Sequence, residues 1–237
     1  YVDWKAFGKT DRVYLKQYEE ETNLVCYLLL DVSESMTYRS DGAALSKLDY
    51  ARCVAASLAY LVLQQQDGVG LTTFDAEVRA MIRPSTHPTH LGAMLHALEA
   101  PPTTAKTSLG PIFHDLAERF KKRGVVVILS DLFDDPASLI AGLKHLRHRR
   151  HEVVLFHVID PAEEEFPFRD LTLFKGLEGL PQELVDPAAL RKAYVQEFEH
   201  FVREVKNGCH ARQIDYVPLR TDRPLDLALS TYLAARR

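Results

Sequence analysis

Three long apolar runs dominate the pattern of hydrophobic and polar positions along the chain. They read LVCYLLLD at 24–31, VVVILSD at 125–131 and EVVLFHVID at 152–160. A run without alternation is typical of a strand that is buried on both faces, as in the middle of a parallel sheet. Shorter strands are predicted at 68–75, 78–82 and 214–219.

Helical periodicity fills the segments between these strands. A helix is predicted from about Ser46, because Ser46 and Asp49 have the spacing of a capping box and an apolar stripe follows them. The stripe consists of Leu48, Ala51, Ala55, Leu58, Ala59 and Val62. A second helix is predicted at 90–100, where two consecutive prolines end it.

Further helices are predicted in the second half of the chain. They follow Thr107 with a stop at Gly124, run from Asp135–Pro136 to about His148, and open at Asp186–Pro187. The helix after Thr107 has the apolar face Leu109, Ile112, Phe113, Leu116 and Phe120. The helix after Pro187 has the stripe Leu190, Tyr194, Phe198, Phe201, Val202 and Val205. A small hairpin within 171–185 and a short C-terminal helix complete the prediction.

Strands that alternate with helices indicate an α/β fold with a doubly wound, mostly parallel sheet and helices on both faces. We therefore expect one domain at 24–237. Residues 1–23 are expected to form an N-terminal arm, in which 11–21 alternate with period two and are compatible with an edge strand. Because the first residue is tyrosine, we also expect an upstream segment.

Composition narrows the classes of function. The formal net charge of the 237 residues is -4, which gives no reason to expect nucleic acid as a partner. No apolar stretch approaches the roughly 20 residues of a membrane span, and no signal peptide opens the chain. The three cysteines are widely spaced without a CxxC motif, which is typical of small buried thiols in a reducing cytoplasm.

Two aspartates stand at the ends of the first two apolar runs. In open α/β sheets, ligands bind at the carboxyl ends of the strands near the switch point in strand order, so Asp31 and Asp131 are expected to face one crevice. Ser33 and Ser35 lie on the loop that leaves the first strand, and Thr107 lies just before a helix. Two carboxylates and three hydroxyls suit a hard cation, Mg²⁺ first and Mn²⁺ or Ca²⁺ next.

Hydroxyl ligands neutralise little of the charge of a cation. A site built from them leaves room for an outside oxygen ligand, which is the logic of a docking site. We therefore expect a protein partner whose Asp or Glu completes the coordination.

The five residues in this order resemble the metal-ion-dependent adhesion site of von Willebrand factor type A domains. In that motif an Asp-x-Ser-x-Ser loop, a threonine and a further aspartate surround one cation, which matches Asp31, Ser33, Ser35, Thr107 and Asp131. The segments 2–23, 47–61 and 186–194 are also similar to the bacterial domain of unknown function 58 family. That resemblance implies a von Willebrand factor type A-like fold and a role beside a MoxR-type AAA+ ATPase, as an adaptor.

An enzyme is the alternative interpretation. A haloacid dehalogenase-like, Mg-dependent phosphotransferase also places a nucleophilic aspartate after its first strand, here Asp31. That chemistry needs a general acid two residues later, where this chain has Ser33. Asp135 is better explained as a helix cap before Pro136. We therefore expect no catalytic activity.

Each candidate ligand also has a purely structural interpretation. Ser33 and Ser35 are common in turns, and Thr107 suits the cap of the following helix. The histidines of KHLRHRRHE at 144–152 are expected at a solvated helix end, and His87 and His90 in a surface loop.

Overall fold

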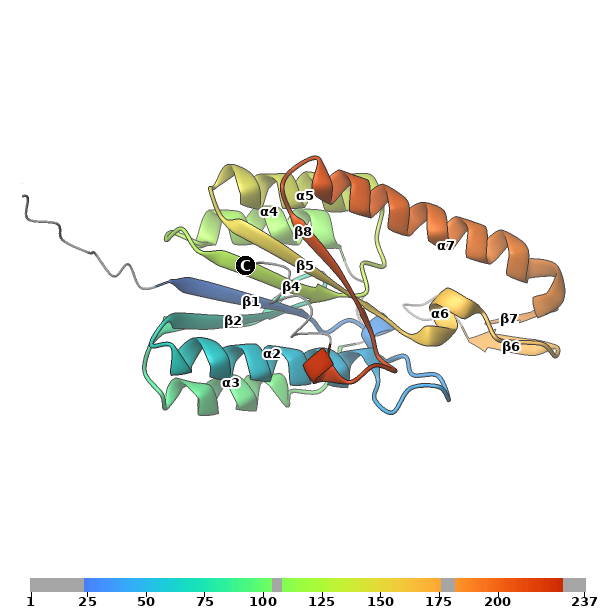
Figure 1. The fold of residues 1–237 in the computed structure, drawn as a ribbon, viewed down its shortest axis with the longest axis horizontal. Coiled ribbons are helices and arrows are strands. Elements are labelled where there is room, and N and C mark those ends of the chain that lie inside the picture. The colour runs from blue at the N-terminus through green and yellow to red at the C-terminus, as the bar shows by residue number, and fades with distance from the viewer. Residues whose placement is uncertain (1–23, 104–107, 176–181, 228–237) are drawn as a thin grey trace, which may run out of the picture.

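A six-stranded sheet forms the centre of the computed structural model, which describes residues 24–103, 108–175 and 182–227 (Figure 1). The strands are β1 (Val25–Asp31), β2 (Gly68–Phe74), β3 (Val78–Ser85), β4 (Val125–Ser130), β5 (Glu152–Ile159) and β8 (Asp215–Arg220). Their order is β3-β2-β1-β4-β5-β8, and every neighbouring pair is parallel except β2 and β3. The predicted α/β fold with a mostly parallel sheet is confirmed.

Helices cover both faces of this sheet. On one face lie α2 (Lys47–Gln64) and α3 (His90–Leu98), and on the other lie α4 (Leu109–Arg119), α5 (Pro136–His148) and α7 (Pro187–His210) (Figure 1). The chain thus forms two apolar cores, one on each side of the sheet. The expected arm at 1–23 lies outside the described residues, and the expected C-terminal helix is seen only at 225–227.

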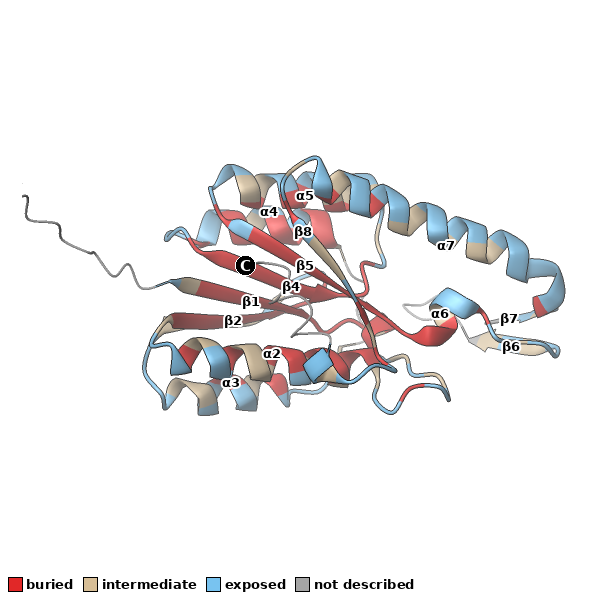
Figure 2. Cartoon of the chain, viewed as in Figure 1, coloured by how far each residue is buried: buried red, intermediate tan, exposed pale blue. Residues whose placement is uncertain are grey.

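Strand β1 shows why an uninterrupted apolar run was needed. Leu28 and Leu30 pack into the core on the side of α2, whereas Tyr27 and Leu29 pack into the core on the side of α4 and α5. Side chains alternate across a strand, so a strand with helices on both faces must be apolar at every position. Figure 2 shows the buried strands as the layer between the two sets of helices.

The switch point of the sheet lies between β1 and β4. From β1 the chain crosses over through α2 to β2 on one side, and from β4 it crosses through α5 to β5 on the other. These two helices lie on opposite faces of the sheet, so the connections diverge at the carboxyl ends of β1 and β4. A crevice opens at such a point in doubly wound sheets.

A smaller layer is attached beyond this edge of the sheet. It consists of α6 (Pro161–Glu165), the hairpin of β6 (Thr172–Lys175) and β7 (Gln182–Val185), and the first half of α7. The stripe predicted on α7 is therefore only partly correct as a buried face. Val205 is fully buried against the main core, but Leu190 is 40% exposed because it lies beyond the sheet.

Three sequence predictions were wrong in detail. Helix α4 ends at Arg119, and Gly124 instead starts the approach of β4 to β1, where an added Cβ would lie 2.1 Å from the carbonyl oxygen of Val25. His151 is buried, with Tyr27 and Phe120 packed edge-on against its ring. Cys53 is exposed, whereas Cys26 and Cys209 are buried as expected.

Within the described residues, no helix combines the length and the apolar character that a membrane crossing needs.

Candidate metal centre

The structure brings the two predicted aspartates to the switch point. Asp31 is the last residue of β1, and Asp131 directly follows the neighbouring strand β4. Both side chains are buried, Asp31 completely. The charge of Asp131 is close enough to raise the pKa of Asp31, so the two carboxylates share one environment. They lie on adjacent strands at the same edge of the sheet, as the sequence predicted.

Asp31 is held by hydrogen bonds but not by a cation. Its Oδ1 accepts from the backbone N–H of Ser33 at 3.0 Å, and its Oδ2 accepts from the hydroxyl of Ser130 at 2.6 Å. Among the described residues no basic side chain forms an ion pair with it. Burial, followed by the charge of Asp131, raises its pKa to about 7. Its charge is therefore uncompensated within the described part of the chain.

The two serines of the loop after β1 point into the same crevice. The hydroxyl oxygens of Ser33 and Ser35 lie 3.1 Å apart, and both residues are buried. The hydroxyl of Ser35 also donates to Asp131, which helps to lower the pKa of that carboxyl. Glu34, between the two serines, is less buried than either of them. The alternation Ser-Glu-Ser thus places both hydroxyls on the inner side of the loop.

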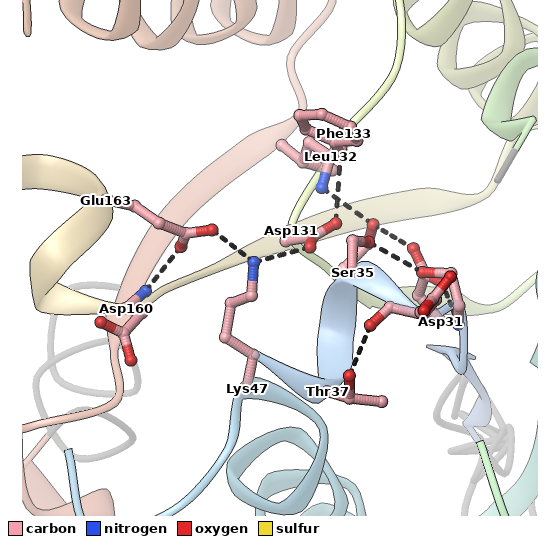
Figure 3. Close-up of polar contacts among 12 residues, drawn as sticks. Asp31, Ser35, Thr37, Lys47, Asp131, Leu132, Phe133, Asp160 and Glu163 are labelled. Carbon is pink, nitrogen blue, oxygen red and sulfur yellow. Dashed lines mark hydrogen bonds and ion pairs between the residues drawn. The ribbon is translucent and has the colours of Figure 1, made fainter. Parts of the chain in front are cut away.

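Asp131 has a cation partner that the sequence analysis missed. The ammonium of Lys47, at the start of α2, lies 2.7 Å from Asp131 Oδ2 and also pairs with Glu163 on α6 (Figure 3). Burial acts to raise the pKa of Asp131, but Lys47 and the donors around the carboxylate outweigh it and hold the pKa below its usual value. The backbone N–H of Phe133 donates to the other oxygen at 3.3 Å.

His157 contacts the backbone of Asp131. Its Nε2 lies 3.1 Å from the carbonyl oxygen of Asp131, and its Nδ1 lies 2.6 Å from the hydroxyl of Tyr216. A carbonyl oxygen can only accept, so we assign the proton to Nε2, and Nδ1 then accepts from Tyr216. Burial lowers the pKa of His157 to about 4, so the ring is neutral at physiological pH.

Thr107, the remaining predicted ligand, lies outside the described residues. The residues on either side of the segment 104–107 are hydrogen-bonded to the loops that follow β1 and β4. The backbone N–H of Thr103 donates to the carbonyl of Val32 at 3.0 Å, and the N–H of Leu109 donates to Asp134 Oδ2 at 2.7 Å.

The donor set fits a small hard divalent cation. Four oxygen-bearing side chains converge, Asp31, Ser33, Ser35 and Asp131, and carboxylate and hydroxyl oxygens are the ligands that Mg²⁺ prefers. The described residues hold no cluster of three or more His, Cys, Asp or Glu that fits a metal, so a cation at this site would need hydroxyl oxygens among its ligands.

The charges of the buried side chains also favour a divalent cation at this site. When ionised, Asp31, Asp131 and Glu163 carry three negative charges against the one positive charge of Lys47, which leaves two. Uncompensated charge is costly to bury, so a divalent cation at this site would stabilise the ionised carboxylates.

Sequence reasoning missed Lys47 and Glu163, which lie 116 residues apart in the chain. One signal was available for Lys47. A lysine in the first turn of a helix is disfavoured by the positive end of the helix dipole, so a lysine directly after the cap Ser46 indicates a nearby acidic partner.

A cavity of about 620 Å³ opens beside this centre. Ser35, Lys47 and Asp131 line one end of it, and the remaining wall is mostly aromatic and aliphatic. The two ligand candidates among these three residues therefore face a space that can admit an outside group.

Curated relatives match the whole of this chain. Uncharacterised proteins of Mycobacterium tuberculosis and Mycobacterium bovis are each 24% identical to this chain over 240 residues, covering all of it and 74% of the relative.

Solved structures share the fold at low identity. BatB from Bacteroides thetaiotaomicron matches with a TM-score of 0.58 and 14% identity, covering 90% of this chain and 98% of that one. The SpRpn10 VWA domain matches with a TM-score of 0.50 and 11% identity, covering 88% and 95%. The fold is therefore of the von Willebrand factor type A kind. The family described as "Protein of unknown function DUF58" matches residues 1–215, so the chain belongs to that family.

Proposed function

We propose that this chain is a metal-dependent protein–protein interaction module. In this proposal Asp31, Ser33, Ser35 and Asp131, joined by Thr107 from the next loop, hold a divalent cation, Mg²⁺ first and Mn²⁺ or Ca²⁺ as alternatives. An Asp or Glu of a protein partner completes the coordination. The observation that carries the proposal is the meeting of two buried carboxylates and two buried hydroxyls at the switch point, where no basic residue in the described part of the chain pairs with Asp31.

The surrounding residues have orienting roles. Ser130 and the backbone of Ser33 fix both oxygens of Asp31, while Lys47 and the backbone of Phe133 fix those of Asp131. When bound, the cation offers a Lewis-acidic position to an incoming carboxylate, because hydroxyls neutralise little of its charge. Asp131 and Ser35 line the cavity and therefore face the side from which a partner can approach.

The partner we propose is a MoxR-type AAA+ ATPase, for which this chain acts as an adaptor. The support for this partner is the resemblance of the chain to its family, because that resemblance implies the adaptor role. A cytoplasmic location fits the absence of disulfides among three free cysteines. One structural neighbour, from Bacteroides fragilis, is named an aerotolerance-related membrane protein, with a TM-score of 0.55 and 16% identity.

The phosphotransferase alternative has no specific observation in its favour. At the position where that chemistry needs a general acid, two residues after the nucleophile, the chain has Ser33. We therefore keep the expectation that purified protein turns over no phosphate ester, an expectation that a phosphatase assay with Asp31→Asn as the comparison tests directly.

Calorimetric titration of the purified chain with MgCl₂ tests the metal site. The variant Ser33→Ala/Ser35→Ala should lose the binding isotherm, while Ser57→Ala, which removes a hydroxyl from α2 away from the site, should keep it. The same three proteins, used as bait for a MoxR-type ATPase with Mg²⁺ and then with chelator, test the metal bridge. Capture by the double variant and by the chelated protein that equals capture by the wild type in Mg²⁺ would refute the bridge.

A further inference from the structure

The cavity beside the candidate metal centre has a built aromatic wall. Phe166 stacks on Phe174 of the hairpin with ring centroids 5.8 Å apart, and it contacts Tyr194 of α7 at 4.6 Å. Phe168 meets both Phe166 and Phe174 edge-on at 5.2 Å. These rings come from three elements and fix one another, so the wall is pre-formed.

Phe166 adopts an unfavourable backbone conformation at this position. It ends α6 with φ 44° and ψ 65°, in the left-handed region that aromatic residues rarely occupy, and its side chain is 4% exposed. Strained backbone persists where surrounding contacts demand it, and it is enriched at ligand sites. With this backbone conformation, Phe166 lines the cavity.

Apolar surface continues from the cavity onto the outside of the molecule. Phe133, two residues after Asp131, is 53% exposed and lines the cavity next to the metal centre. On the hairpin, Leu173 and Leu184 form a cross-strand pair and are 59% and 63% exposed. Leu190 of α7 lines the cavity and is 40% exposed. Contiguous exposed apolar surface of this kind marks an interaction site.

From these features we infer that the partner segment carries bulky apolar side chains next to its acidic residue. The inference rests on the proposed function, because the acidic residue is the one that completes the cation site. The acidic residue of the partner segment would lie at the end of the cavity next to Asp131, where a bound cation attracts a carboxylate. The apolar side chains of the segment would contact the aromatic wall, and Phe133 would provide the first apolar contact close to Asp131.

The size of the surface favours a protein segment over a small molecule. The volume of the cavity, about 620 Å³, suits a drug-sized ligand as well as several side chains of a peptide, so the distinction comes from the apolar surface outside the cavity. Leu173 and Leu184 extend the apolar surface across the hairpin. A polypeptide covers the cavity and this outer surface together.

A peptide library with one fixed central aspartate tests the inference. Heptapeptides with six random positions are selected on the full chain in MgCl₂, and the selected pools are sequenced. We expect enrichment of Phe, Leu, Ile, Met and Trp within two positions of the aspartate. Asp-dependent binders without apolar enrichment, or no binders at all, would overturn the inference.

Variants of matched exposure locate the contact. Leu190→Ser on the cavity wall should weaken binding of a selected peptide about tenfold, since one buried leucine is worth about that factor. Leu61→Ser on α2, where the leucine is 42% exposed, should leave affinity unchanged. Equal thermal midpoints of the two variants show that the difference is not one of folding. Equal affinity of the two variants would overturn the inference.

The two proposals fail differently in this experiment. If selected peptides lose affinity with Leu190→Ser but bind equally well in chelator, or with Asn in place of their aspartate, the metal bridge is wrong and the apolar contact is right. If binding needs Mg²⁺ and the aspartate but ignores Leu190→Ser, the metal bridge stands and the apolar contact is wrong.

Discussion

The ammonium of Lys47 lies 2.7 Å from Oδ2 of Asp131, and both side chains are almost completely inaccessible to solvent. Lys47 also pairs with Glu163, so one cation is shared by two carboxylates. Asp31, on the neighbouring strand, accepts hydrogen bonds from Ser33 and Ser130 and forms no ion pair with any residue that the structure describes. Among the described residues the site is therefore asymmetric: Asp131 is paired with a cationic side chain, and Asp31 is not.

Replacing Lys47 by methionine should strongly destabilise the protein. The substitution keeps most of the side-chain volume but leaves the buried Asp131 and the partly buried Glu163 without their cation, and breaking a buried ion pair costs about 3–5 kcal/mol in comparable cases. Urea unfolding in chelator measures the change. Lys144→Met, at an exposed position of α5, is the control and should stay within about 0.5 kcal/mol. Similar stability of the two variants would show that the ion pair is not needed for folding.

The sequence predicted the central sheet because its physics is local. An uninterrupted apolar run indicates a strand that is buried on both faces, and an apolar stripe indicates a helix that is buried on one face. The predicted caps Ser46 and Asp135 accept the expected backbone hydrogen bonds. The placement of Asp31 and Asp131 followed, since the carboxyl ends of neighbouring parallel strands lie at one edge.

Features that depend on distant parts of the chain could not be read in the same way. The pairing of Lys47 with Glu163 depends on where α6 lies relative to α2. The exposure of Leu190 depends on how far α7 extends past the sheet, because an apolar stripe has the same pattern whether a core or a partner covers it. Periodicity thus predicts that Leu190 lies on an apolar face but not what covers that face.

Gly124 offers a test of how tightly β1 and β4 approach each other. A Cβ at this position would lie 2.1 Å from the carbonyl oxygen of Val25, so Gly124→Ala must displace the start of a central strand. We expect a loss of about 1–3 kcal/mol in unfolding free energy. Gly92→Ala, on the exposed side of α3 with no atom within 4 Å, should instead stabilise by about 1 kcal/mol. A neutral Gly124→Ala would mean that the strands separate easily there.

The three cysteines should differ sharply in reactivity. Burial raises the pKa of Cys26 and of Cys209 to about 12, whereas Cys53 is exposed on α2. Only the thiolate reacts with an aromatic disulfide reagent, so at pH 8 one thiol per chain should react quickly. Cys53→Ser should remove that fast phase, and denaturant should release the other two. Two or three fast equivalents in the native protein would contradict the burial of Cys26 or Cys209.

Asp31→Asn should separate the stability of the fold from the binding of metal. The pKa of Asp31 is raised to about 7, compared with 3.8 for an unperturbed carboxyl, so its ionisation opposes folding increasingly as the pH rises between these values. In chelator the variant should therefore match the wild type near pH 4 and exceed it at pH 7.5 by about 1–3 kcal/mol. The amide keeps the hydrogen bonds, because the hydroxyl of Ser130 can accept as well as donate.

Urea unfolding at the two pH values measures the gain in stability of Asp31→Asn, and calorimetry should show that Mg²⁺ no longer binds. Asp170→Asn, at an exposed position, should change neither property. A variant that is less stable than the wild type at pH 7.5 in chelator would show that the charge of Asp31 is already balanced within the protein.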